Sequence, residues 1–141
     1  MDAHPVTGGR IDVSGEQTPD GAKISAAELE RLAVEEVPVA GEMGVVVDSV
    51  SPGEVRARVP YRESFLRPGG TVAGPVLMAL ADFVTWGVVM SLIGPVKLAV
   101  TTSLNINFLR KPGPGDHAVN RCDCAILPPE RERCKVRLFT R

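Results

Sequence analysis

Residues 72–95 read VAGPVLMALADFVTWGVVMSLIGP, a long apolar run rich in Ala, Leu and Met. The run predicts a helix of about five turns, which the Gly-Pro pair at its end terminates. Asp82, near the middle, is the only charged residue between Arg67 and Lys97. A helix that is apolar almost all round is either buried inside a fold or spans a membrane.

The position of the acid favours the buried helix. A carboxylate near the centre of a membrane helix lies where the bilayer penalty is largest. The run also follows a Pro-Gly-Gly sequence at residues 68–70 and carries Gly87 in its interior. We therefore expect a soluble fold with no membrane partner. The 16 basic and 17 acidic residues leave a net charge of -1, which argues against a nucleic-acid partner as well.

Upstream of the long helix, the sequence predicts a short helix and a hairpin. Residues 25–28 read SAAE, a capping-box pattern ahead of apolar residues at helical spacing, and Pro38 should end this helix. Residues 45–50 (VVVDSV) and 54–59 (EVRARV) flank a Ser-Pro-Gly turn, and apolar residues alternate with arginines in the second of them. This pattern predicts two antiparallel strands with one face in water, followed by a loop over residues 61–70.

Downstream of the long helix, three strands are expected. Residues 99–109 alternate apolar and polar side chains, which predicts a long strand with one polar face. Residues 117–127 (HAVNRCDCAIL) and 134–140 (CKVRLFT) predict two more strands, with turns at KPGPGD and PPERER before each of them.

These elements predict one α+β domain in which an antiparallel sheet wraps around one long central helix. A chain of 141 residues with 44% hydrophobic content fits a single compact domain, which we expect over residues 24–141. Residues 1–23 are polar and carry no secretory signal pattern, so we expect a flexible tail and a cytoplasmic protein. The helix surface that one sheet leaves uncovered invites a second subunit.

The cysteines do not indicate a metal site. Cys122, Cys124 and Cys134 all lie near the C-terminal end, and the first two are too close for ordinary zinc-ligand spacing. Reduced thiols in a cytosol are the simplest interpretation.

The stretch from Arg67 to Asp116 resembles the phenylacetate-degradation-type (PaaI-like) branch of the hot-dog-fold acyl-CoA thioesterases. That branch has a loop bearing an asparagine, a Gly-x-x-His-Gly-Gly turn into the helix, a Leu-Ala-Asp on the helix, and a strand ending in Asn-Phe-Leu-Arg. The corresponding residues here are Arg67–Gly70, Ala73–Pro75, Leu80–Asp82 and Asn107–Arg110. The resemblance implies a hot-dog fold and hydrolysis of an acyl- or aryl-CoA thioester, with no cofactor, in a homodimer or homotetramer whose sites lie between subunits.

Three residues are catalytic candidates by this resemblance. Asp82 would be the carboxylate that activates water or attacks the thioester, Gly74 would supply the N–H that polarises the thioester oxygen, and Thr101 would place a hydroxyl near the water. A carboxylate in apolar surroundings is costly to bury unpaired, so Asp82 should face a wet cleft or a partner. The alternatives are that Asp82 pairs with a backbone group across a dimer, and that Gly74 and Thr101 are ordinary turn and strand residues.

The same resemblance indicates positions for substrate binding, with basic residues at the end of the strand for CoA phosphates. They are Arg67, Gly70, Ala73, Pro75, Trp86, Asn107, Arg110 and Lys111. Trp86 and Met90 lie four and eight residues after Asp82 and could line an acyl pocket, with core packing as the alternative for both.

Three of these positions depart from the family pattern. Arg67 stands for the asparagine, Ala73 for the histidine and Pro75 for the second glycine. Proline is tolerated in the first turn of a helix, but losing the other two polar groups removes contacts that position substrate or water. Family members also continue past the position of Arg141 with one more strand inside the sheet. A noncatalytic acyl-CoA-binding module, or an inactive remnant lacking its last strand, is therefore the alternative function.

Overall fold

The structure, a computed structural model, describes the chain over residues 21–108, 121–126 and 134–139. The elements in chain order are α1 (Ala26–Glu36), α2 (Pro38–Met43), β1 (Val46–Ser51), β2 (Glu54–Arg58), the 3-10 turn η1 (Glu63–Phe65), β3 (Leu66–Arg67), β4 (Thr71–Val72), α3 (Gly74–Ile93), β5 (Arg121–Ile126) and β6 (Cys134–Phe139). Of the expected tail at residues 1–23, residues 1–20 lie outside the described residues, as do the two turns before β5 and β6. The prediction is wrong for residues 21–23, because Ala22 is buried in the core and the Lys23 N–H donates to the Ser91 carbonyl.

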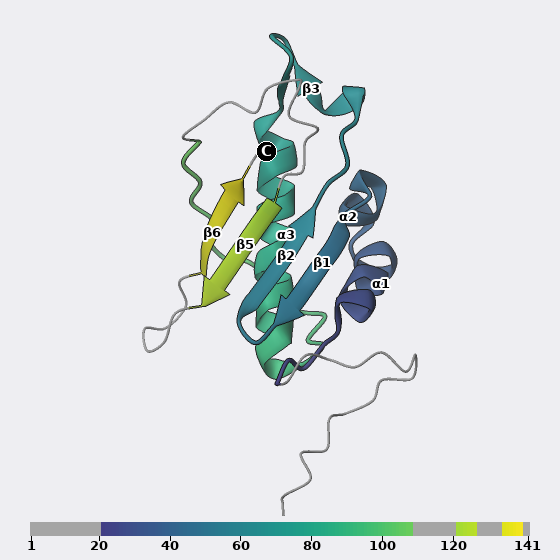
Figure 1. The fold of residues 1–141 in the computed structure, drawn as a ribbon, viewed down its shortest axis with the longest axis vertical. Coiled ribbons are helices and arrows are strands. Elements are labelled where there is room, and N and C mark those ends of the chain that lie inside the picture. Colours follow the sequence, from purple (N-terminus) through teal and green to yellow (C-terminus); the bar gives the residue numbers. More distant parts are fainter. Residues whose placement is uncertain (1–20, 109–120, 127–133, 140–141) are drawn as a thin grey trace, which may run out of the picture.

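Two layers make up the fold (Figure 1). Four antiparallel strands form one sheet in the order β1-β2-β5-β6, and α3 lies across one face of it. The helices α1 and α2 lie beside β1, at one edge of the sheet. The predicted α+β arrangement, an antiparallel sheet against one long central helix, is confirmed.

The N-terminal helix forms as the capping pattern predicts. The Ser25 hydroxyl accepts a hydrogen bond from the Glu28 N–H at 3.1 Å, and Leu29 and Leu32 are buried. The helix α2 was not predicted, because Pro38 was expected only to end the preceding helix. Proline is also well suited to the first position of a new helix, and Pro38 occupies that position in α2.

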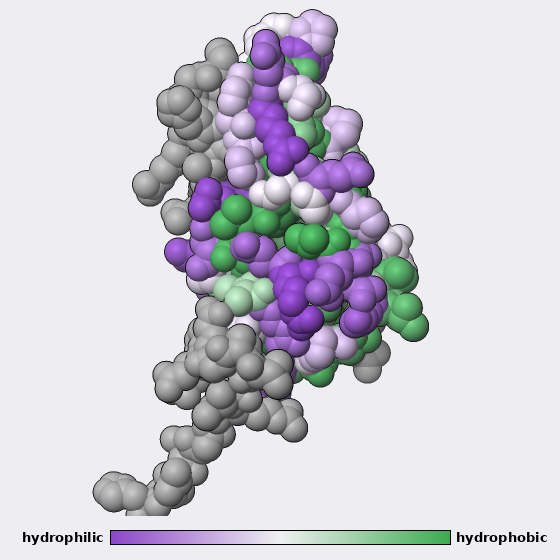
Figure 2. Space-filling view, turned by 90° about the vertical axis from the view of Figure 1, so that its right-hand side faces the viewer, coloured by the Kyte–Doolittle hydropathy of each residue, from purple (hydrophilic) through white to green (hydrophobic). Residues whose placement is uncertain are grey.

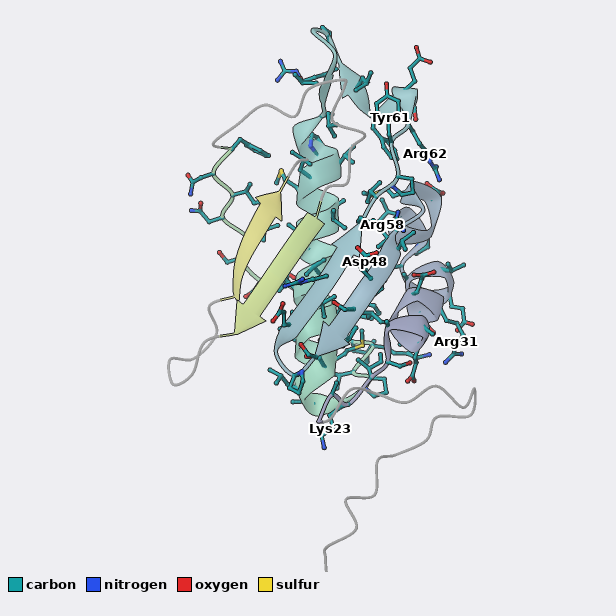
Figure 3. The ribbon with its side chains drawn as sticks, viewed as in Figure 1. Lys23, Arg31, Asp48, Arg58, Tyr61 and Arg62 are labelled. Atoms are coloured by element: carbon teal, nitrogen blue, oxygen red, sulfur yellow. The ribbon has the colours of Figure 1, made fainter. Side chains whose placement is uncertain are left out.

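The hairpin of β1 and β2 has the predicted pairing and burial. Val55, Ala57 and Val59 point into the core, whereas Arg56 is exposed. On the outer face, the Arg58 guanidinium contacts the Asp48 carboxylate at 2.9 Å across the two strands (Figure 3). The side of the molecule on which α1 and α2 lie is mostly hydrophilic, with hydrophobic side chains scattered over it (Figure 2).

The long helix α3 supplies the centre of the core. Its buried residues include Leu80, Val84 and Val88, which pack with apolar side chains of the hairpin and of α1. Close packing requires a glycine at Gly87, because a Cβ there would lie 2.7 Å from Cδ2 of Leu29. Within the described chain, α3 is the one helix long and apolar enough to cross a membrane, and half of its most apolar window is buried inside this fold.

The prediction of a long strand over residues 99–109 is wrong for residues 99–108, the part that the structure describes. Residues 99–108 form no helix or strand, and no backbone ladder joins them to the sheet. The green trace of this segment runs outside β6 in the view of Figure 1. Alternation of apolar and polar residues favours an extended chain, but a strand also needs a neighbouring strand to bond its backbone groups. The short hairpin of β3 and β4, in turn, lies where only a loop was predicted.

Candidate active site

A short hairpin leads the chain into the N-terminal end of α3. Arg67 and Thr71 pair across it, and the Gly70 N–H donates to the Arg67 carbonyl at 3.0 Å. Pro68 and Gly69, the latter with φ at 95°, occupy the two central turn positions, which is the pattern of a type II turn. The side chain of Arg67 is exposed at this turn. It is therefore accessible to a negatively charged ligand.

The first turn of α3 begins with a backbone donor, the Gly74 N–H. Ala73 is the N-cap and provides no side-chain hydrogen bond, because a methyl group cannot accept one. Among the described residues, no acceptor is found for the Gly74 N–H, and Pro75 has no N–H to offer. The N-terminal end of a helix carries a partial positive charge, so this N–H is suited to a carbonyl oxygen that gains negative charge.

The Phe108 side chain lies against this N-terminal turn. A Cβ built on Gly74 would be 3.3 Å from Cζ of Phe108 and 3.8 Å from both Cε atoms of the ring. Residues 94–108 thus return from the C-terminal end of α3 to its N-terminal end. Phe108 belongs to the Asn-Phe-Leu-Arg motif of the family, but no role was predicted for it, since no pattern along the chain relates it to Gly74.

Asp82 is exposed on α3, as the desolvation cost of a carboxylate requires. Within the described part of the chain, its carboxylate has no hydrogen bond or ion pair, and no group of three metal-ligating side chains occurs. Asp82 follows Gly74 by eight residues on one helix, which places the two about 12 Å apart along the axis and about 80° apart around it. One chain therefore does not bring both groups to a single bond of a substrate.

Trp86 and Met90, which were considered for an acyl pocket, pack against or within the hydrophobic core. Trp86 is half-buried and packs against the core, with its ring centroid 6.1 Å from that of Phe83 and the rings tilted by 50°. Met90 is completely buried. Core packing was the alternative for both residues. Met90 has that role, and a contact of Trp86 with substrate stays a prediction.

The other predicted site residues lie on the segment after α3 or outside the described residues. Thr101 and Asn107 are exposed on the segment after α3, which is not a strand here. Arg110 and Lys111 lie outside the described residues, so their contacts with CoA phosphates stay a prediction.

Arg62 is a residue near the site that the sequence analysis missed. Its guanidinium donates to the Glu42 carbonyl at the end of α2 and lies 5.6 Å from the ring centroid of Phe65 (Figure 3). The Phe65 carbonyl in turn accepts from the N–H of Ala73, the N-cap of α3, at 2.8 Å. Arg62 thereby connects α2 to the loop that fixes the start of α3.

Comparisons with known proteins agree with this fold. A family model described as Thioesterase superfamily matches residues 69–125. A "putative thioesterase" from Silicibacter sp. TM1040 has a solved structure with 30% identity and a TM-score of 0.68, covering 86% of this chain and 85% of that one.

Two further relatives point the same way. The structure of a mutant phenylacetic acid degradation protein PaaI from Thermus thermophilus has 26% identity and a TM-score of 0.59, covering 74% of this chain and 89% of that one. A "putative esterase" of Thermoplasma acidophilum is 32% identical over 69 residues, 49% of this chain and 52% of that protein, so the chain spans about half the length of that curated relative. The chain belongs to the thioesterase superfamily and is a PaaI-like member with the hot-dog fold.

Proposed function

We propose that this protein hydrolyses an acyl- or aryl-CoA thioester to the free acid and CoA. Membership of the thioesterase superfamily supports thioester hydrolysis in general. The observation that carries the specific proposal is the pair of unpartnered groups on α3 within the described chain, the Gly74 N–H and the Asp82 carboxylate. One is a hydrogen-bond donor and the other a base or nucleophile, which are the groups that this reaction needs.

In the proposed reaction, the Gly74 N–H donates to the thioester oxygen and stabilises the negative charge that develops there. Asp82 either removes a proton from water, which then attacks the carbonyl carbon, or attacks that carbon itself to form an anhydride that water later hydrolyses. In both routes a C–O bond forms, the C–S bond breaks, and the leaving thiolate of CoA takes up a proton. Neither route requires a metal or a redox cofactor.

A second copy of the chain would complete the site. Because Gly74 and Asp82 of one chain are about 12 Å apart along α3, a site needs the N–H of one copy and the carboxylate of another. Two antiparallel α3 helices related by a two-fold axis would bring these groups together, with the midpoint, Met78, next to its own symmetry mate. Met78 is 41% exposed and Ile93 is 64% exposed, so α3 presents apolar surface for such contact. We propose a homodimer or homotetramer with sites between subunits.

Basic residues would hold the CoA part of the substrate. Arg67 is exposed on the turn before α3, and its guanidinium can bind phosphate through two N–H groups. Arg110 and Lys111 are proposed to contribute in the same way, and Thr101 to place a hydroxyl near the attacking water. Such soluble metabolite chemistry fits a cytoplasmic protein.

A second candidate function is binding of acyl-CoA without turnover. It is favoured by Ala73, which has only a methyl group where the family pattern has a histidine, and which leaves the N-cap of α3 without a side-chain hydrogen bond. Loss of one positioning contact can lower a rate on the order of 10²-fold.

The test is release of free thiol from short, medium, long and aromatic acyl-CoAs by the wild-type protein and Asp82→Ala. We expect the variant to lose at least about 100-fold in kcat for the preferred substrate, because the carboxylate acts only in the chemical step. Asp48→Ala is the matched control, since Asp48 is a carboxylate in an ion pair on the outer face of the sheet.

Each outcome separates the candidate functions. Equal rates for wild type and a folded Asp82→Ala would refute the role of Asp82. Binding of acyl-CoA by a folded wild type that releases no thiol would instead support the binding module.

A further inference from the structure

The ring of Phe108 covers the Gly74 end of α3. Its Cζ atom lies 3.3 Å from the position of a Cβ on Gly74, which is closer than most side-chain contacts. Gly74 therefore has no room for a side chain while the ring stays in place. Because a Cβ lies about 2.5 Å from the nitrogen of its own residue, the ring lies within about 6 Å of the Gly74 nitrogen, close to where a ligand bonded to this N–H would be.

The side chain of Phe108 is partly open to solvent. Phe108 is 54% exposed although it contacts the helix, and Asn107 before it is exposed as well. Ile106 packs against the core and anchors the segment two residues earlier. The backbone of residues 99–108 takes part in no helix or strand. The contact with Gly74 and the anchor at Ile106 therefore hold the ring at this turn, with part of its surface open to a ligand.

A thioester bonded to the Gly74 N–H would place the atoms that flank its carbonyl carbon near the ring of Phe108. A carbonyl oxygen bonded to the Gly74 N–H lies about 3 Å from the Gly74 nitrogen. The two atoms attached to the carbonyl carbon then lie within about 5 Å of that nitrogen. On one side is the sulfur of CoA, which is the same in every substrate. On the other side is the first carbon of the acyl group, whose branching differs between substrates.

We infer that Phe108 is a specificity-determining residue, whose ring excludes acyl groups that are branched or bulky next to the carbonyl. This inference rests on the proposed function, because it uses the Gly74 N–H as the donor to the thioester oxygen. Phe108 acts by steric exclusion and takes no part in the chemical step.

The first experiment compares a straight-chain and an α-branched acyl-CoA of equal carbon number. Wild type should prefer the straight chain, and Phe108→Ala should reduce this preference in kcat/KM by about 10-fold or more, within the range that one or two carbon atoms give in an apolar pocket. Phe108→Leu should fall between the two. Val100→Ala is the matched control, since Val100 is an apolar residue of the same segment that is 81% exposed. A preference unchanged by Phe108→Ala would overturn the inference.

The same comparison by binding separates this inference from the proposed function. Dissociation constants of both acyl-CoAs are measured in the Asp82→Ala background, with and without Phe108→Ala. If wild type hydrolyses nothing but Phe108→Ala still relaxes the selectivity of binding, the proposed function fails and the role of Phe108 stands. If hydrolysis is confirmed and selectivity is unchanged in both assays, the role of Phe108 fails alone.

A third measurement needs no ligand. Gly74→Ala should lower Tm in the wild type because the new methyl group meets the ring, and should lower it less in Phe108→Ala, where the ring is gone. Additive effects of the two substitutions on Tm would show that the ring does not occupy this space, and would overturn the inference.

Discussion

Single polar groups tie distant segments of this fold together, and Ser91 is the clearest case. Its side chain is completely buried in the last turn of α3. The hydroxyl donates to the Val88 carbonyl at 2.7 Å and accepts from the N–H of Gly53, in the turn of the β1–β2 hairpin, at 2.9 Å. The Ser91 carbonyl accepts from the Lys23 N–H at 2.9 Å. One residue thus joins α3, the hairpin and the start of the domain.

Ser91→Ala should destabilise the protein by about 1–3 kcal/mol, because it leaves the N–H of Gly53, a buried residue, without its acceptor. Urea unfolding followed by circular dichroism measures the change. Ser103→Ala is the control, since Ser103 is exposed and has no hydrogen bond among the described residues. Equal midpoints for the two variants would contradict this account of Ser91.

At the scale of elements, the contact of α1 with α3 depends on a missing side chain. Gly87 is buried at the middle of α3, where a Cβ would meet Leu29 of α1 at 2.7 Å and Val55 of β2 at 3.5 Å. Glycine lowers helix stability by about 1 kcal/mol relative to alanine. At Gly87 this loss of helix stability is offset by the close packing of α3 against α1 and β2.

Gly87→Ala should destabilise by about 1–3 kcal/mol despite the better helix propensity of alanine, because Leu29 is completely buried and has little room to move. The double variant Leu29→Ala/Gly87→Ala tests the cause. If the methyl group conflicts with Leu29, the loss of unfolding free energy in the double variant is smaller than the sum of the two single losses. A stabilising Gly87→Ala would show that the helices simply move apart.

At the scale of the whole molecule, the exposed apolar surface of α3 and the geometry of the proposed site both indicate a second copy of the chain. The apolar residues that α3 leaves uncovered include Met78, Leu92 and Ile93, with Asp82 among them along the helix. The distance of about 12 Å between Gly74 and Asp82 along one helix requires a second copy for a complete site. A two-fold contact around Met78 would cover this apolar surface and bring Gly74 of one copy close to Asp82 of the other.

Met78→Glu should weaken the dimer and lower activity together, because it places two like charges beside each other at the proposed axis. Size-exclusion chromatography with light scattering measures the mass at several concentrations, and the wild type should have twice or four times the mass of one chain. Val39→Glu is the matched control, because Val39 is 53% exposed on α2, away from the proposed contact. A fully active Met78→Glu monomer would rule out a site shared between subunits.

Local patterns in the sequence determined most of the elements. The apolar run with its terminal Gly-Pro predicted α3, the capping box predicted α1, and alternation around a Ser-Pro-Gly turn predicted the hairpin. These predictions succeed because caps, turns and periodic burial depend on residues a few positions apart. The exposure of Asp82 followed from the cost of burying an unpaired carboxylate.

Only the tertiary structure decided which distant segments meet. The alternation in residues 99–108 could not show that this segment pairs with no strand among the described residues, because a strand is defined by its neighbour. Three contacts join residues 20 to 38 positions apart: that of Phe108 with Gly74, the bond from Gly53 to Ser91 and the bond from Arg62 to Glu42. Such contacts follow from how the whole core packs, and no local pattern of residues encodes them.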